Sequence, residues 1–132
     1  SNKNRQLMSV NKLRGKKAIT NYKTIETYQN NDVPKISLVE CKLETGRTHQ
    51  IRVHMAFKGN SILGDKAYGK NKKKFRKINS NLEKIIIGFN RQALHAKSLG
   101  FIHPKSGINI FFEAPRPNDF AKLIKILKKS TI

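Results

Sequence analysis

The sequence predicts an α+β domain with a mostly antiparallel sheet and flanking helices. Three features lead to this prediction: two alternating apolar segments around a polar turn, two shorter apolar segments around a turn with Pro and Gly, and apolar residues at helical spacing near the C-terminus. The chain has 132 residues, of which 37% are hydrophobic, and this length corresponds to one domain or part of one.

The first two predicted strands form a hairpin. Residues 1–16 are basic and irregular. Residues 18–28 alternate loosely and are rich in Thr, Ile and Tyr, as is typical of a strand. The sequence Asn-Asn-Asp at 30–32 indicates a turn, and residues 36–43 again alternate between apolar and polar types.

The next segment, residues 45–59, has two interpretations. Apolar residues occur at every second position from 51 to 57, which favours a strand. Thr48, however, is a residue type that caps helices, and Ile51 and Met55 are four residues apart, as on one face of a helix. Periodicity alone favours the strand.

The middle of the chain is rich in turns and in lysine. Residues 59–69 contain the turn-forming residues, and a dense basic run follows, for which we expect a solvated, mobile loop. Residues 83–89 contain three consecutive isoleucines and predict a short buried strand. The basic run consists of Lys66, Lys70, Lys72, Lys73, Lys74, Arg76 and Lys77.

The last third predicts two strands and a helix. The strands are expected at 93–101 and 108–113, joined by a tight turn at 103–107. The helix is expected to begin with Asn118 as N-cap and Asp119 in its first turn. Its apolar residues recur at helical spacing, and basic residues at 128–129 suit its C-terminal end.

Charge is the most informative part of the composition. Lys and Arg number 28 against 8 acidic residues, a formal net charge of +20. Such a surface attracts polyanions, and neutralising phosphates releases counterions, so we expect a nucleic-acid partner. No apolar run approaches the roughly 20 residues that span a bilayer, and the first residues are polar, so we expect a cytoplasmic protein that does not contact the membrane.

The sequence excludes several kinds of chemistry. A single cysteine, Cys41, rules out a disulfide framework, and its apolar neighbours predict a structural role. No glycine-rich phosphate loop and no Gly-x-Ser-x-Gly turn is present. His49, His54, His95 and His103 lack the spacing and the carboxylate neighbours of a metal site, so we expect them to form hydrogen bonds in or beside the core.

The remaining polar cluster is Glu-Thr-Gly-Arg-Thr-His-Gln-Ile-Arg-Val-His-Met at residues 44–55. Gly46 permits a positive φ in a turn. From the residues alone, this segment is either a functional site or an ordinary polar edge of the sheet. Its donors suited to a phosphate or a base edge are Arg47, Thr48, His49, Gln50 and Arg52.

Residues 44–54 resemble the signature E-T-G-R-T-H-Q-I-R-V-H of the RluA/RluD-like family of RNA pseudouridine synthases. Further blocks follow in the family's order between about Met8 and Phe120. They are similar to G-K-x-A-x-T at 15–20, I-x-G-D-x-x-Y-G at 62–69, R-Q-x-L-H-A at 91–96, L-x-F-x-H-P at 99–104, and the apolar-acidic-A-P-x-P block at 112–117.

The resemblance implies that residues 1–132 are the C-terminal portion of a single pseudouridine synthase catalytic domain. It also implies that residues 48–57 are helical, which overrides the periodicity. The family's nucleophilic aspartate belongs to an H-R-L-D-x-x-T-S-G block before the G-K-x-A-x-T segment, and its active-site tyrosine also lies upstream. This sequence contains neither block, and Asp32, Asp65 and Asp119 do not match the nucleophile.

The function implied by the resemblance is isomerisation of uridine to pseudouridine in rRNA or tRNA, without metal or other cofactor, by a protein of which this portion alone is inactive. Arg52 matches the arginine that pairs with the nucleophile. Arg47, His49 and Gln50 are expected near RNA phosphate or the flipped nucleotide, and the basic run along phosphates. The partners are RNA and the upstream half of the domain. The alternative, a non-catalytic basic RNA-binding module, explains the charge but not the ordered blocks.

Overall fold

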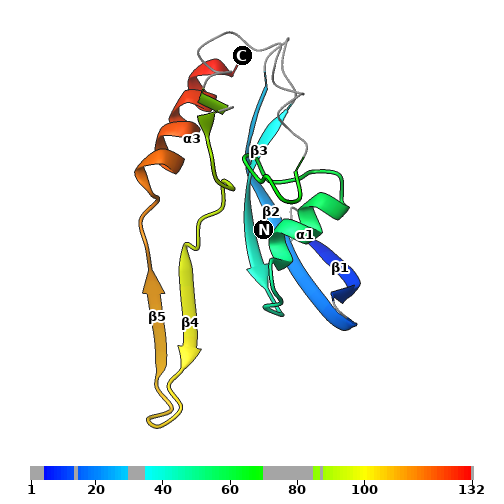
Figure 1. Ribbon diagram of the computed structural model, residues 1–132. Coiled ribbons are helices and arrows are strands. Elements are labelled where there is room, and N and C mark those ends of the chain that lie inside the picture. The colour runs from blue at the N-terminus through cyan, green and yellow to red at the C-terminus, as the bar shows by residue number, and fades with distance from the viewer. Residues whose placement is uncertain (1–4, 14, 30–34, 70–84, 87, 132) are drawn as a thin grey trace.

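A computed structural model describes residues 5–13, 15–29, 35–69, 85–86 and 88–131. This part of the chain contains a three-stranded and a two-stranded antiparallel sheet together with helices α1 and α3 (Figure 1). The predicted α+β class with antiparallel sheets is therefore confirmed. In the part of the chain that the structure describes, no helix has the length and apolar character needed to cross a membrane.

The three-stranded sheet has the order β1-β2-β3, with strands Arg5–Leu13, Lys16–Tyr28 and Ile36–Leu43. The predicted β2–β3 hairpin is confirmed, with Tyr22 opposite Cys41. The interpretation of the first residues as irregular was wrong, because β1 pairs with β2. Its alternation is too loose to predict a strand, and the regular ladder offered by the long neighbouring β2 supplies its backbone hydrogen bonds.

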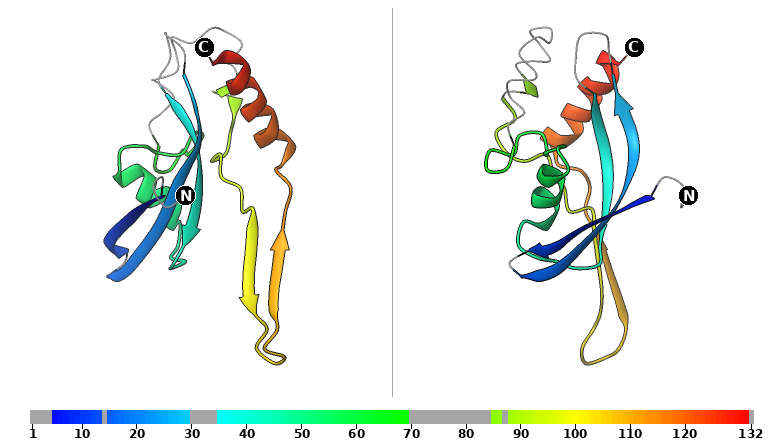
Figure 2. Two further views of the ribbon diagram at one scale, coloured as in Figure 1. Left: turned by 180° about the vertical axis from the view of Figure 1, so that it is seen from behind. Right: turned by 90° about the vertical axis from the view of Figure 1, so that its right-hand side faces the viewer.

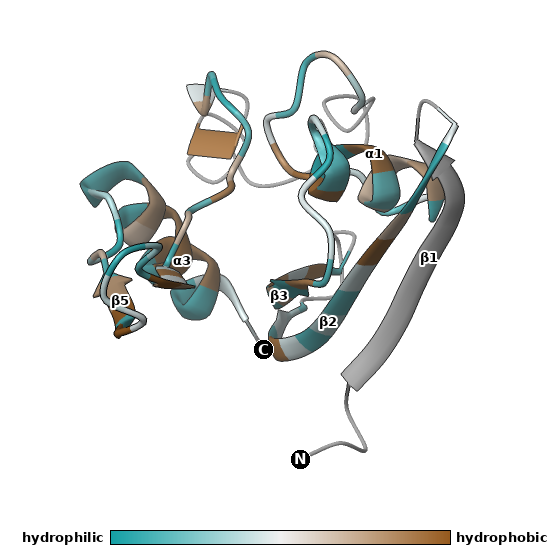
Figure 3. Cartoon of the chain, turned by 90° about the horizontal axis from the view of Figure 1, so that it is seen from below, coloured by the Kyte–Doolittle hydropathy of each residue, from teal (hydrophilic) through white to brown (hydrophobic). Residues whose placement is uncertain are grey.

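Helix α1 spans Gln50–Phe57 and lies across one face of this sheet (Figure 3). The helix implied by the resemblance is confirmed, and the strand favoured by periodicity was wrong. The apolar residues at period two do not share a buried face, since Phe57 is 79% exposed, whereas Gln50 and His54, four residues apart, are buried. Thr48 is not the N-cap: His49 occupies that position with a left-handed φ of 52° and no side-chain cap.

The segment before residue 90 was predicted as a strand, and this prediction was wrong: residues 85, 86 and 88 are helical. A short run of buried apolar residues occurs in both kinds of element, so the isoleucines could not distinguish them. Ile86 is nevertheless buried, as expected. The basic loop expected at residues 70–77 lies outside the described residues.

The second sheet is the hairpin of β4, Ser98–Ile102, and β5, Asn109–Glu113. The hairpin and its turn are confirmed, although β4 begins later than the predicted residue 93. Helix α3, Asn118–Ser130, is confirmed with Asp119 in its first turn, but Pro117 rather than Asn118 is at the N-cap position.

The main core joins α3 to the first sheet. Helix α3 lies beside the end of β2 that carries Tyr28 (Figure 2). Burying a large apolar side chain contributes roughly 1.5–3 kcal/mol, so the buried residues between α3 and the sheet hold the C-terminal helix in place. The buried residues are Tyr28, Ile86, Phe89, Phe120, Leu123, Ile124 and Leu127.

Candidate active-site cluster

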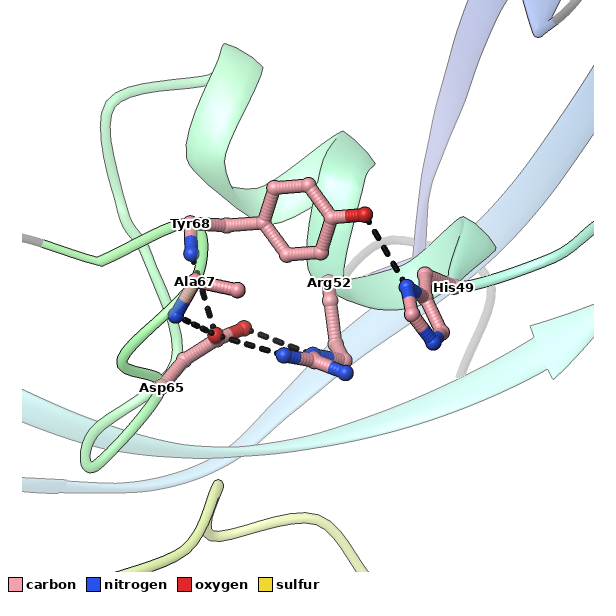
Figure 4. Close-up of polar contacts among 5 residues, drawn as sticks. All are labelled: His49, Arg52, Asp65, Ala67 and Tyr68. Carbon is pink, nitrogen blue, oxygen red and sulfur yellow. Dashed lines mark hydrogen bonds and ion pairs between the residues drawn. The ribbon is translucent and has the colours of Figure 1, made fainter.

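The central feature of the site is a buried ion pair between α1 and the turn that follows it (Figure 4). Arg52 donates from Nε to Oδ2 of Asp65 and from Nη2 to Oδ1, both at 2.9 Å. The Arg52 side chain is 14% exposed, and the Asp65 side chain is fully buried. A bidentate pair of this kind fixes the plane of the guanidinium as well as its position.

The Asp65 carboxylate has further donors. Its Oδ1 also accepts hydrogen bonds from the backbone N–H groups of Ala67 and Tyr68, each at 3.1 Å. The hydrogen bond from Arg52 holds the pKa of Asp65 below its ordinary value, against the opposing effect of burial. Asp65 is therefore an ionised carboxylate with four hydrogen bonds, which suits a fixed structural acceptor and not a nucleophile.

Backbone crowding fixes the turn that carries Asp65. Gly64 has a φ of 80°, and a Cβ at this position would overlap the carbonyl oxygen of Arg91. The carbonyl of Leu63 accepts a hydrogen bond of 2.8 Å from the backbone N–H of Ala93. Two sequence blocks, residues 62–69 and 91–96, are thus in direct contact, and glycine is required where they meet.

Tyr68 and His49 extend the cluster towards solvent. The guanidinium carbon of Arg52 lies 5.0 Å from the centroid of the Tyr68 ring, within the range of a cation–π contact. The Tyr68 hydroxyl shares a hydrogen bond of 2.9 Å with Nδ1 of His49. Both residues are exposed, so the cluster runs from a buried carboxylate through Arg52 to an aromatic surface.

Gln50 lies inside the protein, whereas the resemblance implied a position near the RNA. Its side chain is buried, and it makes four hydrogen bonds within the protein. Its Oε1 accepts from Thr45 Oγ1 and the Arg47 backbone N–H, and its Nε2 donates to the Ile19 carbonyl and to Thr20 Oγ1. These bonds use the full capacity of an amide, so Gln50 attaches the start of α1 to β2.

His54 is part of the same buried network. Its Nδ1 lies 2.8 Å from Thr20 Oγ1, and its Nε2 has no partner among the residues that the structure describes. Burial lowers the pKa of His54, which favours the neutral ring. The expected hydrogen bonding of this histidine in the core is confirmed.

The other candidate residues lie at the surface or outside the described ranges. Arg47 is exposed and donates from Nε to the Lys17 carbonyl at 3.3 Å, and Lys66 is also exposed. Cys41 is partly buried, and burial raises the pKa of its thiol to about 11, in keeping with a structural role. No group of three His, Cys, Asp or Glu residues that could hold a metal ion occurs within the described ranges. The candidates outside these ranges are Lys70, Lys72, Lys73, Lys74, Arg76 and Lys77.

Comparison with known proteins identifies relatives of this chain. Residues 1–57 match the family model described as RNA pseudouridylate synthase. The chain is 48% identical over 128 residues to the ribosomal large subunit pseudouridine synthase D of Zymomonas mobilis, covering 96% of this chain and 37% of that protein. It belongs to the RluA/RluD-like pseudouridine synthase family. The ribosomal large subunit pseudouridine synthase D of Vibrio parahaemolyticus is 42% identical over 127 residues, which cover 96% of this chain and 37% of that protein. The uncharacterized RNA pseudouridine synthase YlyB of Bacillus subtilis is 46% identical over 128 residues, which cover 97% of this chain and 36% of that protein.

The chain spans a little over a third of the length of those relatives. Within it, the structure brings Arg52 and His49 together with Asp65 and Tyr68. From the sequence, Asp65 and Tyr68 were only parts of a family block and had no expected place in the site. Their pattern, Gly-Asp-x-x-Tyr-Gly after a polar helix, was visible, but the pairing with Arg52 required the path of the intervening turn.

Proposed function

We propose that the full-length protein is an RNA pseudouridine synthase that converts uridine to pseudouridine in rRNA or tRNA. In this reaction the N1–C1′ bond breaks, the uracil turns, and C5 bonds to C1′, with no net oxidation or reduction. The observation that carries the proposal is the ordered set of family blocks, which continues from the matched family model through residue 117. This chain supplies the C-terminal portion of the catalytic domain, and the upstream portion supplies the nucleophilic aspartate.

The unused hydrogen-bonding capacity of Arg52 supports its assigned role. Asp65 takes the N–H of Nε and one N–H of Nη2. The other three N–H groups of the guanidinium have no partner among the residues that the structure describes. Two of them, one on Nη1 and one on Nη2, form a second edge that can hold another carboxylate in a bidentate geometry. In the proposed enzyme that carboxylate is the nucleophilic aspartate.

An exposed apolar hairpin supports the proposal that the upstream portion packs against this chain. In the register of β4 and β5, Leu99 lies opposite Phe112 and Phe101 opposite Ile110, so these four side chains share one face. Ile102 and Phe111 lie on the opposite face and are also exposed. A two-stranded hairpin with two apolar faces is only marginally stable in water, so we assign its cover to the upstream portion.

RNA contacts in this proposal come from the surface cations. Arg47 and Lys66 are exposed, and His49 presents its ring beside Tyr68. These side chains provide groups that can bind phosphates, and the basic residues in the sequence at 70–77 and the net charge of +20 add to the attraction for RNA. A basic RNA-binding module without catalysis would explain this charge, but it would not require the buried Arg52–Asp65 pair.

The proposal is tested by tritium release from RNA containing 5-tritiated uridine. The full-length protein should release tritium, and Arg52→Ala should reduce single-turnover release on the order of a hundredfold or more while leaving RNA affinity nearly unchanged. Arg52→Lys should also be impaired, because it retains the charge but loses the planar fork.

Lys73→Ala is the control, and it should weaken RNA binding slightly without changing the chemical step. If Arg52→Ala and Lys73→Ala both reduce binding and leave chemistry intact, Arg52 is a phosphate contact. Residues 1–132 alone should remain at background, and clear turnover by them would contradict the placement of the nucleophile upstream.

A further inference from the structure

We propose that Asp65 is a positioning residue for Arg52, a role that rests on the proposed function. Asp65 binds one edge of the guanidinium through Nε and Nη2. The edge formed by Nη1 and the second N–H of Nη2 then remains for the carboxylate that reacts with the uridine. In this arrangement Arg52 bridges two carboxylates, one that fixes it and one that it serves.

The surroundings of Asp65 suit a fixed anchor. Its side chain is fully buried, and turning the carboxylate would break the bonds from Ala67 and Tyr68 as well as those from Arg52. The backbone is fixed too, since the carbonyl of Asp65 accepts a hydrogen bond of 2.9 Å from the N–H of Gly69. An anchor of this kind limits the rotation of the arginine side chain, which otherwise has several low-energy rotamers.

A second contact restrains the guanidinium from its face. Tyr68 lies 5.0 Å from the guanidinium carbon, and its hydroxyl is bonded to His49. The edge contact with Asp65 and the face contact with Tyr68 together define both the direction and the plane of the guanidinium. Neither contact uses Nη1 or the second N–H of Nη2, which form the edge proposed for the reacting carboxylate.

The kinetic test uses the full-length protein and Asp65→Asn, which preserves the shape of the side chain but removes the bidentate acceptor. We expect kcat to fall about tenfold to a hundredfold and KM for RNA to change less than about twofold, because other cations hold the phosphates. If Asp65 acts through Arg52, the double variant Arg52→Ala/Asp65→Asn should lose no more activity than Arg52→Ala alone. An unchanged kcat, or losses that multiply in the double variant, would overturn the proposal.

The matched control is Asp119→Asn. Asp119 makes the same bidentate contact with Arg91, at 2.8 and 2.9 Å, but at an exposed position. It should leave kcat unchanged. A similar loss of kcat in both variants would show a general effect of removing an Arg–Asp pair and would count against a specific role for Asp65.

A second measurement does not depend on activity. In the full-length wild-type protein labelled with ¹⁵N-arginine, the Nε–H of Arg52 should exchange with solvent more than about tenfold more slowly than that of Arg91. Asp65→Asn should remove most of this protection. If the two arginines exchange equally fast in the wild type, Asp65 does not position Arg52, whatever the enzyme does. If protection is seen but the wild type forms no pseudouridine, the proposed function fails while the Asp65–Arg52 anchor remains.

Discussion

Two arginine–aspartate pairs in this chain have nearly the same geometry and very different surroundings. Arg52 and Asp65 are joined by two hydrogen bonds of 2.9 Å, and Arg91 and Asp119 by bonds of 2.8 and 2.9 Å. The side chains of the first pair are 14% and 0% exposed, and those of the second are 38% and 49% exposed. Each arginine also lies over an aromatic ring, at 5.0 Å for Tyr68 and 5.4 Å for Phe89.

The difference shows that pairing geometry alone does not identify a functional site. Asp119 lies in the first turn of α3, where a negative charge stabilises the helix, so structure alone explains it. Arg91 connects that helix to the block at residues 91–96. Asp65 is instead enclosed by a turn whose own backbone is crowded, and the Arg52 guanidinium keeps an edge without a partner in the described part of the chain. Fixed support on one side and an available edge on the other are expected of a residue that serves a reaction.

Of the variants that distinguish the two pairs, Gly64→Ala should destabilise the protein most, because Gly64 precedes Asp65 in the turn. The new methyl group would overlap the Arg91 carbonyl oxygen, and a φ of 80° is strained for alanine. Left-handed strain and overpacking together should destabilise the full-length protein by about 4 kcal/mol, or prevent folding of the turn. Thermal unfolding monitored by circular dichroism measures this loss.

Gly107→Ala separates the two causes. Gly107 has a φ of 70°, but a Cβ there has no heavy atom within 4 Å. It should therefore show only the conformational strain, about 1 kcal/mol. Equal losses of stability in the two variants would mean that the contact between the turn of Asp65 and Arg91 adds no constraint. The buried pair would then not differ from the exposed pair in the rigidity of its backbone.

The next largest loss of stability is expected when the aspartate of each pair is replaced by asparagine. Asp65→Asn leaves the mostly buried Arg52 with one acceptor in place of two and should cost about 3 kcal/mol. Asp119→Asn should lower the melting temperature several-fold less, because the side chains of both Arg91 and Asp119 are exposed to water. The pKa of Asp65 is lowered in the folded state, so its contribution is present above the ordinary value of 3.8 and is lost as the pH falls through the folded-state pKa. Melting temperatures of the wild type and the variants at pH 7 and in steps below the ordinary pKa of 3.8 test both statements, and equal shifts at pH 7 would contradict the first.

Much of this architecture could be predicted from local patterns, and the exceptions have physical causes. The β2–β3 hairpin and α3 follow from alternation and from helical spacing, because each buries one face. The strand β1 could not be predicted, since its partner β2 and not its own pattern makes it a strand. For α1, the alternating residues from 51 to 57 favoured the wrong element, the helical spacing of Ile51 and Met55 left a helix open, and the family resemblance decided for the helix.

The candidate site was partly predictable in the same sense. Arg52 was identified from its block, but its partner within the chain was not, because 13 residues separate it from Asp65. The family resemblance implied a place for Gln50 near RNA phosphate or the flipped nucleotide. Its burial depends on four partners, two of them in β2, and no local pattern shows that such partners will be present.

The smallest predicted effect concerns salt. Exposed charges about 3 Å apart are surrounded by water and ions, and raising the ionic strength from about 0.05 to 0.5 M weakens their attraction, whereas ions cannot enter around a buried carboxylate. The destabilisation caused by Asp119→Asn should therefore shrink with added salt, and that caused by Asp65→Asn should stay nearly constant. Sodium chloride series of melting temperatures for the full-length protein and both variants measure the two trends, and the wild type corrects for the general effect of salt on a protein of this charge. If the Asp65→Asn difference shrinks as much as the Asp119→Asn difference, solvent reaches the first pair as freely as the second, and the buried anchor proposed for Arg52 does not exist in solution.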